Sequence, residues 1–228
     1  MPSQPTTAER SREPRSLLAA ARLCVLVDGG ADARDFEDRV AGLVSAGVPL
    51  LQIRDKNLPD RVLLGRVRQA LAVVQRQPTP RTLVIVNDRV DVAAAAGADG
   101  AHLGASDLPV TAARAILGPD RLIGCTAHDL AEADAANAAG ADYLGVGPCF
   151  PSTTKAFAVQ ADREFLAAAA RLPLPVFAIG GIVPQRLPEL AALGIDRIAV
   201  AAAVTKAADP EAAARAFIDA IGTVQRRA

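Results

Sequence analysis

The chain has 228 residues, of which 51% are hydrophobic, and its 25 basic and 25 acidic side chains give a net charge of zero. That balance argues against a protein that binds duplex nucleic acid or a membrane surface, and an aromatic content of 3% argues against a stacking platform for single strands. Three scattered cysteines and the lack of an apolar run of about 18 residues favour a cytoplasmic protein without disulfides, zinc or a membrane span.

The chain divides into a polar start and a regular remainder. Residues 1–20 are rich in serine, threonine, proline and charge, which predicts a disordered N-terminal tail. Beyond them, eight short apolar runs alternate with alanine-rich helical stretches. The runs do not alternate with polar residues, as is typical of parallel strands covered by helices. The predicted strands are 23–27, 50–53, 82–86, 100–103, 121–125, 142–146, 175–179 and 196–200.

Eight strands, each followed by a helical stretch, predict an α/β protein that folds as a (β/α)8 TIM barrel, a single domain over residues 21–228. A second pattern supports closure of the barrel. A glycine that ends a helix recurs before every second strand, at Gly47, Gly97, Gly140 and Gly194. An open doubly wound sheet is the alternative, but no GxGxxG motif follows the first strand.

Cations follow the second predicted strand. Active sites of TIM barrels form at the C-terminal ends of the strands. Gln52, Arg54 and Lys56 occupy alternate positions, so an extended chain points the three side chains the same way. An amide and two cations on one face suit a polyanion such as pyrophosphate. A solvent-exposed strand end is the alternative interpretation.

Carboxylates follow the next two strands. Asn87 and Asp88 come at the end of the third strand, and the fourth strand leads from His102 to Asp107. Each aspartate alone would suit a helix N-cap. Two hard oxygen ligands at adjacent strand ends, beside cations that suit a diphosphate, predict a Mg²⁺ site. His102 lies at the edge of this group, and a hydrogen bond to a neighbour is its alternative role.

Hydroxyl groups follow the fifth and sixth strands. Thr126 and His128 come after the fifth strand, and the sixth leads into the long loop GVGPCFPSTTKAF. Hydroxyls and backbone amides beside a lysine suit phosphate binding and stabilisation of a departing anion. The loop residues that predict this role are Ser152, Thr153, Thr154 and Lys155. The length of the loop is typical of a lid, and a Ser/Thr-rich mobile loop without a ligand is the alternative.

Small residues end the last two strands. Gly181 follows the seventh strand, and Ala201 and Ala202 follow the eighth, where residues 200–207 predict a short extra helix. Small side chains let backbone N–H groups approach a ligand, and phosphate commonly binds at this position of the fold. The pattern therefore predicts a phosphorylated substrate.

Taken together, these motifs resemble the thiamine-phosphate synthase family over about residues 22–222. The matching segments are QIRDK (52–56), VNDRVDVAAAAGADGAHLGASDLP (86–109), GCTAHDLAEADAANAAGADYLGVGPCFPSTTK (124–155) and AIGGI (178–182). The resemblance implies a TIM barrel that joins a hydroxymethylpyrimidine diphosphate to a thiazole phosphate, giving thiamine phosphate and pyrophosphate. Its partners would be these small molecules, with no nucleic acid and no membrane, and a homo-oligomer is left open.

The resemblance also implies roles for the candidate residues. Contacts to the pyrimidine diphosphate fall on Gln52, Arg54, Lys56 and Asn87, with Lys155 on its diphosphate group. Contacts to the thiazole substrate fall on Ser152, Thr153 and Thr154, and the site for its phosphate falls on Gly181, Ala201 and Ala202. Thr126 supplies the substrate-binding hydroxyl that follows the fifth strand. Asp88 and Asp107 correspond to the Mg²⁺ ligands. The sequence departs from the family at Ala201–Ala202, often Val-Ser, and at Thr126, usually serine. The alanine pair puts the affinity for phosphate in doubt more than the activity.

The implied mechanism is dissociative. The diphosphate leaves first, the electron-rich aminopyrimidine stabilises a cation, and the thiazole nitrogen then attacks. Such chemistry needs charge neutralisation on the leaving group, for which Arg54, Lys56, Lys155 and Mg²⁺ are the catalytic candidates. A related thiazole tautomerase, with His102 or His128 as acid and base, is one alternative. A non-catalytic protein that binds thiamine phosphate is the other.

Overall fold

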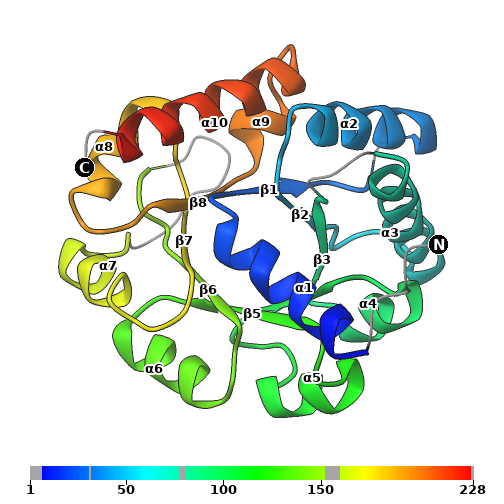
Figure 1. The fold of residues 1–228 in the computed structure, drawn as a ribbon, viewed down its shortest axis with the longest axis horizontal. Coiled ribbons are helices and arrows are strands. Elements are labelled where there is room, and N and C mark those ends of the chain that lie inside the picture. Colours follow the sequence, from blue (N-terminus) through cyan, green and yellow to red (C-terminus); the bar gives the residue numbers. More distant parts are fainter. Residues whose placement is uncertain (1–6, 31, 78–80, 152–159, 227–228) are drawn as a thin grey trace.

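A computed structural model describes residues 7–30, 32–77, 81–151 and 160–226 of the chain. Its eight parallel strands pair in chain order, and the last strand pairs with the first to close the barrel (Figure 1). The predicted TIM barrel is therefore confirmed. The strands are β1 (Leu23–Val27), β2 (Leu50–Ile53), β3 (Leu83–Asn87), β4 (Gly100–Leu103), β5 (Leu122–Ala127), β6 (Tyr143–Val146), β7 (Val176–Ile179) and β8 (Arg197–Val200).

Helices form a ring around the barrel (Figure 1). They are α2 (Ala33–Ser45), α3 (Asp60–Gln75), α4 (Val90–Ala96), α5 (Val110–Leu117), α6 (Leu130–Ala138), α7 (Arg163–Ala169), the 3₁₀ turn Pro184–Arg186 with α8 (Leu187–Ala191), α9 (Ala202–Thr205) and α10 (Pro210–Gln225). Aspartates cap several of them, as Asp162 does by accepting from the N–H of Phe165. The short helix predicted near residue 200 is α9. None of the helices in these ranges is long and apolar enough to cross a membrane.

The strands are apolar on both faces because each face meets its own core. Outward-facing residues such as Val25 and Leu51 pack against the helices, and inward-facing residues such as Leu50 and Phe177 fill the barrel. Burial on both sides explains why the strands carry no polar alternation.

The recurring glycines have the conformation that their position requires. Gly47, Gly97, Gly140 and Gly194 all have positive φ, between 75° and 87°, and each precedes an even-numbered strand. Glycine reaches this left-handed region without steric cost, so it can reverse the chain from helix to strand.

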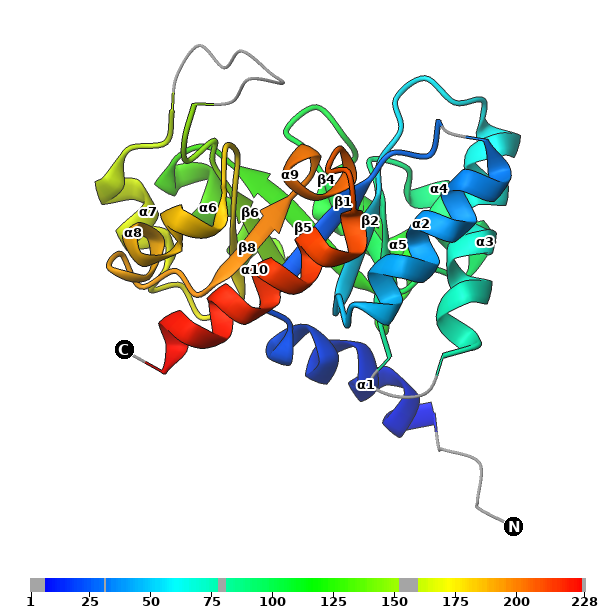
Figure 2. The ribbon, with the colours of Figure 1, turned by 90° about the horizontal axis from the view of Figure 1, so that it is seen from above.

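Helix α1 (Thr7–Ala20) replaces the disordered tail predicted for residues 1–20, of which residues 1–6 lie outside the described part. It crosses the N-terminal end of the barrel (Figures 1 and 2). Leu18 and Ala21 are buried in the interior core, and the Arg15 Nε donates to Asp142 over 2.9 Å. The prediction failed because the segment is polar on average, whereas its few apolar side chains are the ones that cover the end of the barrel.

Candidate active site

The C-terminal ends of the strands lie together on the face opposite α1 (Figure 2). Gln52 is the third residue of β2 and is buried, and Asn87 ends β3. Thr126 lies in β5, Gly181 follows β7, and Ala202 begins α9 after β8. The barrel therefore brings these predicted site residues to one rim, although neighbours among them are 21 to 55 positions apart in the chain. Their roles stay predictions.

An aspartate in a left-handed turn forms one edge of this rim. Asp88 has φ of 62°, and its Oδ2 lies 3.4 Å from the Lys56 Nζ. Burial first, and then the hydrogen-bonded carboxyl group of Asp107, raise the pKa of Asp88. Asp107 Oδ2 accepts from the N–H of Gly104 over 2.6 Å. The predicted metal ligands are thus neighbours, and their mutual repulsion favours a bound cation.

A cavity of about 240 Å³ opens beside this pair. It is lined by Asp55, Lys56, Leu58, Leu63, Asn87, Asp88 and Arg89. The loops after β2 and β3 supply most of the lining. The described ranges contain no group of three or more His, Cys, Asp or Glu side chains that could hold a metal ion alone. Mg²⁺ at Asp88 and Asp107 would take its other ligands from water and substrate, as is usual for this ion.

A chain of hydrogen bonds runs from the barrel interior to the rim. His102 Nδ1 lies 3.1 Å from the Tyr143 hydroxyl, and Nε2 lies 2.9 Å from Thr126 Oγ1. Gln52 is hydrogen-bonded to Tyr143 at the other end. Burial lowers the pKa of His102 to about 4, so the imidazole is neutral at pH 7. Hydrogen bonding to neighbours, the alternative role of His102, is what the structure shows.

Sequence reasoning missed Tyr143, the only tyrosine of the chain. Two glycines on neighbouring strands could have indicated a bulky side chain beside them. A Cβ atom at Gly124 would collide with the Tyr143 ring, and one at Gly145 would lie 3.2 Å from the His102 ring. Glycines inside strands indicate a close neighbour, and here the neighbours are the two buried polar rings.

His128 has a different setting. Its side chain is exposed, and Nδ1 lies 3.1 Å from the carboxylate of Glu132 in α6. The histidine therefore pairs with the first turn of the helix that follows it, and no described contact joins it to Asp88 or Asp107.

Gly181 allows two loops to meet. It has φ of 63°, and a Cβ atom there would lie 2.6 Å from the carbonyl oxygen of Phe150 and would also collide with that of Pro151. The backbone of Phe150 donates to Gly180 over 3.1 Å, which joins the start of the loop after β6 to the end of β7. The predicted loop residues Ser152, Thr153, Thr154 and Lys155 lie outside the described residues.

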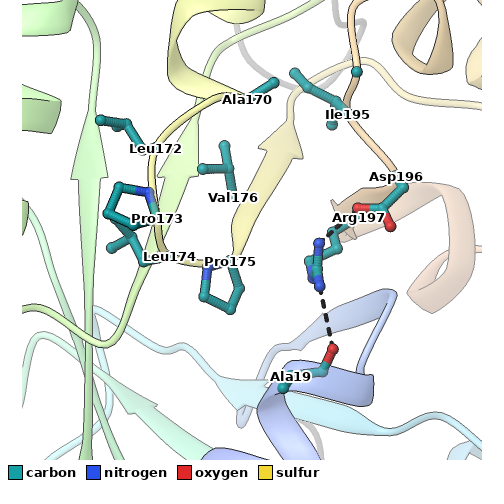
Figure 3. Close-up of a pocket in the computed structure, with 11 residues that line it drawn as sticks. Ala19, Ala170, Leu172, Pro173, Leu174, Pro175, Val176, Ile195, Asp196 and Arg197 are labelled. Carbon is teal, nitrogen blue, oxygen red and sulfur yellow. Dashed lines mark hydrogen bonds and ion pairs between the residues drawn. The ribbon is translucent and has the colours of Figure 1, made fainter.

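A second cavity, of about 400 Å³, lies at the opposite end of the barrel (Figure 3). Residues 172–176 line it together with Ala19, Asp196 and Arg197, whose Nη2 donates to the Ala19 carbonyl over 3.1 Å. Among the described residues, its lining includes none of the predicted site residues. The N-terminal face of this fold usually serves stability.

Comparison with known proteins identifies the family. The family model for thiamine monophosphate synthase matches residues 23–204. The chain belongs to the thiamine monophosphate synthase family. It is 42% identical over 217 residues to the thiamine-phosphate synthase of Mycolicibacterium gilvum, with 91% of both chains covered. It is 41% identical over 215 residues to that of Mycobacterium tuberculosis, covering 90% of this chain and 97% of the relative.

A solved structure agrees with this family assignment. The thiamine phosphate pyrophosphorylase from Pyrococcus furiosus superposes with a TM-score of 0.78 at 32% sequence identity, covering 92% of this chain and 98% of that one. The resemblance inferred from the motifs is therefore confirmed, and the chain is an enzyme of thiamine biosynthesis.

Proposed function

We propose that this transferase joins a hydroxymethylpyrimidine diphosphate to a thiazole phosphate and releases thiamine phosphate and pyrophosphate. Family membership supports the overall reaction. The observation that carries the assignment to this site is the group formed by Asp88, Asp107 and Lys56 at the barrel rim. Two neighbouring carboxylates with an ammonium group beside a polar cavity suit a metal-bound diphosphate.

Mg²⁺ is the cofactor that these residues fit. Asp88 and Asp107 would hold it, because the pair lies close enough for one carboxyl group to raise the pKa of the other. When bound, the ion would supply charge neutralisation for the leaving diphosphate. Arg54 and Lys56 follow β2 on the same rim and would bind the diphosphate oxygens, with Lys155 adding the cation predicted from the loop.

The buried polar chain suits the pyrimidine. Gln52 and Thr126 stand at its two ends, and His102 and Tyr143 hold them in place. We assign Asn87 to the diphosphate and the backbone at Gly181, Ala201 and Ala202 to the thiazole phosphate, with the hydroxyls of residues 152–154 on the thiazole. The chain's own task is then to bind, orient and exclude water while the C–O bond breaks.

The structure gives the alternatives little support. A tautomerase needs an acid and base that can exchange protons with a substrate. His102 uses both ring nitrogens on neighbours, and His128 pairs with Glu132. A sensor that only binds thiamine phosphate would have no use for a pair of carboxylates beside Lys56. The three described cysteines are free and buried, which suits the cytoplasm as the compartment we propose.

Incubation of the purified chain with both substrates, monitored for pyrophosphate, tests the proposal. We expect pyrophosphate and thiamine phosphate in equal amounts when both substrates and Mg²⁺ are present, and no thiamine phosphate when either substrate is omitted. Added chelator should stop the reaction. Isomerisation of a thiazole without pyrophosphate release would identify a tautomerase, and tight binding of thiamine phosphate without turnover would identify a sensor.

A further inference from the structure

The turn at Asp88 is strained. Among the residues that the structure describes, Asp88 is the only one besides glycines with a positive φ. The left-handed region is unfavourable for a residue with a Cβ atom, although aspartate enters it more readily than most. The turn is tight, since the N–H of Arg89 donates to the Asn87 carbonyl over 2.7 Å and the N–H of Asp88 donates to the His102 carbonyl over 2.8 Å. Such a conformation persists only where its surroundings hold it.

Arg89, the next residue, holds two helices at their first turns. Its Nε donates to Asp91 Oδ1 over 2.9 Å and its Nη2 to Asp91 Oδ2 over 2.6 Å, a two-pronged pair with the start of α4. Its Nη1 pairs with Asp60, the first residue of α3. Hydrogen bonds from Arg89 lower the pKa of both carboxyl groups, so both are ionised at neutral pH.

The segments that lead into α3 and α4 carry residues of the candidate active site. The segment from Ile53 to Asp60 carries Arg54 and Lys56, and the turn before α4 carries Asp88. Arg89 lines the same cavity as Lys56 and Asp88. We propose that Arg89 is a positioning residue, which holds the left-handed turn of Asp88 against the Lys56 segment and thereby sets the spacing of the carboxylate and the ammonium group. This inference rests on the metal site of the proposed function.

A purely structural role for Arg89 predicts a different result from a positioning role. The side chains of Asp60 and Asp91 are 72% and 65% exposed, and ion pairs of this kind add little to the stability of a fold. Loss of Arg89 should therefore leave the melting temperature almost unchanged. Residues that orient metal ligands, in contrast, commonly affect metal affinity by about tenfold to a hundredfold.

The test measures binding of Mn²⁺ in the presence of inorganic pyrophosphate by electron paramagnetic resonance, so it needs no turnover. We expect Arg89→Gln to weaken Mn²⁺ affinity about tenfold or more, and Arg89→Lys to weaken it less, because an ammonium group cannot bind two carboxylates in the same way. Arg76→Gln is the matched control, since it breaks the exposed pair between Glu37 of α2 and Arg76, the residue that follows α3. It should bind Mn²⁺ like the unmodified chain.

Asp91→Asn provides a milder variant should Arg89→Gln fold poorly. It should lower Mn²⁺ affinity in the same direction, and the double variant should be no weaker than Arg89→Gln alone, because both changes break one interaction. Equal Mn²⁺ affinity in Arg89→Gln and the unmodified chain would overturn the positioning role. An unmodified chain that binds no Mn²⁺ would overturn the metal site and the role of Arg89 together, whereas the pyrophosphate assay tests the reaction separately.

Discussion

Aspartates occupy both ends of this barrel, and their surroundings differ. At the N-terminal end, Asp142 accepts from the N–H of Ile123 over 2.8 Å, from Arg114 Nη2 over 2.6 Å and from Arg15. Asp99 likewise accepts from the N–H of Val84 and pairs with Arg81. Each carboxylate there is matched by an arginine and a backbone N–H of a neighbouring strand.

At the C-terminal end, Asp88 and Asp107 face each other with Lys56 at 3.4 Å from Asp88. The contrast separates two uses of the same side chain. Carboxylates satisfied by an arginine and a backbone N–H join neighbouring strands, even at Asp99, where burial raises the pKa. Carboxylates that face each other favour binding of a cation.

Asp88→Asn should have the largest effect, and it acts on the unsatisfied end. We expect turnover to fall about a hundredfold, roughly 3 kcal/mol of transition-state stabilisation, with partial recovery in excess Mg²⁺. The folded state raises the pKa of Asp88, so the ionised side chain costs stability once the pH exceeds the folded pKa. The melting temperature at pH 7 should therefore stay the same or rise. Asp107→Asn should behave alike, and full activity with chelator present would contradict the prediction.

His102 lies in the polar interior between the two ends, and it should make the stability of the fold depend on pH. The folded state lowers its pKa to about 4 from 6.5, so the unfolded chain binds the proton more readily. Stability from this group is complete above about pH 6.5 and is lost as the pH falls towards 4, by up to roughly 3 kcal/mol. His102→Gln should remove this part of the pH dependence. Denaturant titrations of both chains at several pH values measure it, and parallel curves would show that His102 is not the group responsible.

Asp142→Ala acts on the satisfied end. It leaves the N–H of Ile123 and the guanidinium of Arg114 without their acceptor, which should destabilise the fold by about 2 kcal/mol. Turnover at a temperature well below melting should stay within about twofold. A large loss of kcat in a folded Asp142→Ala chain would remove the distinction between the two ends.

Leu18→Ala should have the smallest effect on catalysis, although it should cost about as much stability as Asp142→Ala. Leu18 is 2% exposed in the interior core, but it comes from α1 at the open edge of the barrel, where neighbours can adjust. We expect a loss of about 2 kcal/mol in the free energy of unfolding, measured with denaturant, and unchanged KM values for both substrates. A change in KM would show that packing of α1 at the N-terminal end affects substrate binding at the C-terminal rim.

The fold could be predicted from sequence because its signals are local. Apolar runs, amphipathic stretches and left-handed glycines each report on a few neighbouring residues, and the even alternation of strands and helices then leaves one simple way to close the sheet. The positions of Asp88 and Asp107 followed from the same logic, since adjacent parallel strands end at the same edge.

Other features depend on contacts that no local pattern contains. The pairing of Arg89 with Asp60 spans 29 residues and arises only when α3 and α4 lie side by side. Tyr143 meets His102 across the barrel interior, 41 residues away. The sequence of α1 is polar enough to predict a disordered tail, and only the closed barrel provides the interior in which Leu18 is buried. In each case the residue types are common ones, and the contact forms only when the barrel closes.

The position of α1 also decides how the enzyme could be attached to something else. The helix lies across the N-terminal end of the barrel (Figure 2), whereas Asp88 and Gly181 follow the C-terminal ends of β3 and β7. A fusion partner or a solid support joined ahead of Thr7 would approach from that side and leave the mouth of the barrel facing the solution. Immobilised in this orientation, the enzyme should receive both substrates freely, whereas linkage through the turn between β8 and α9 would obstruct their entry.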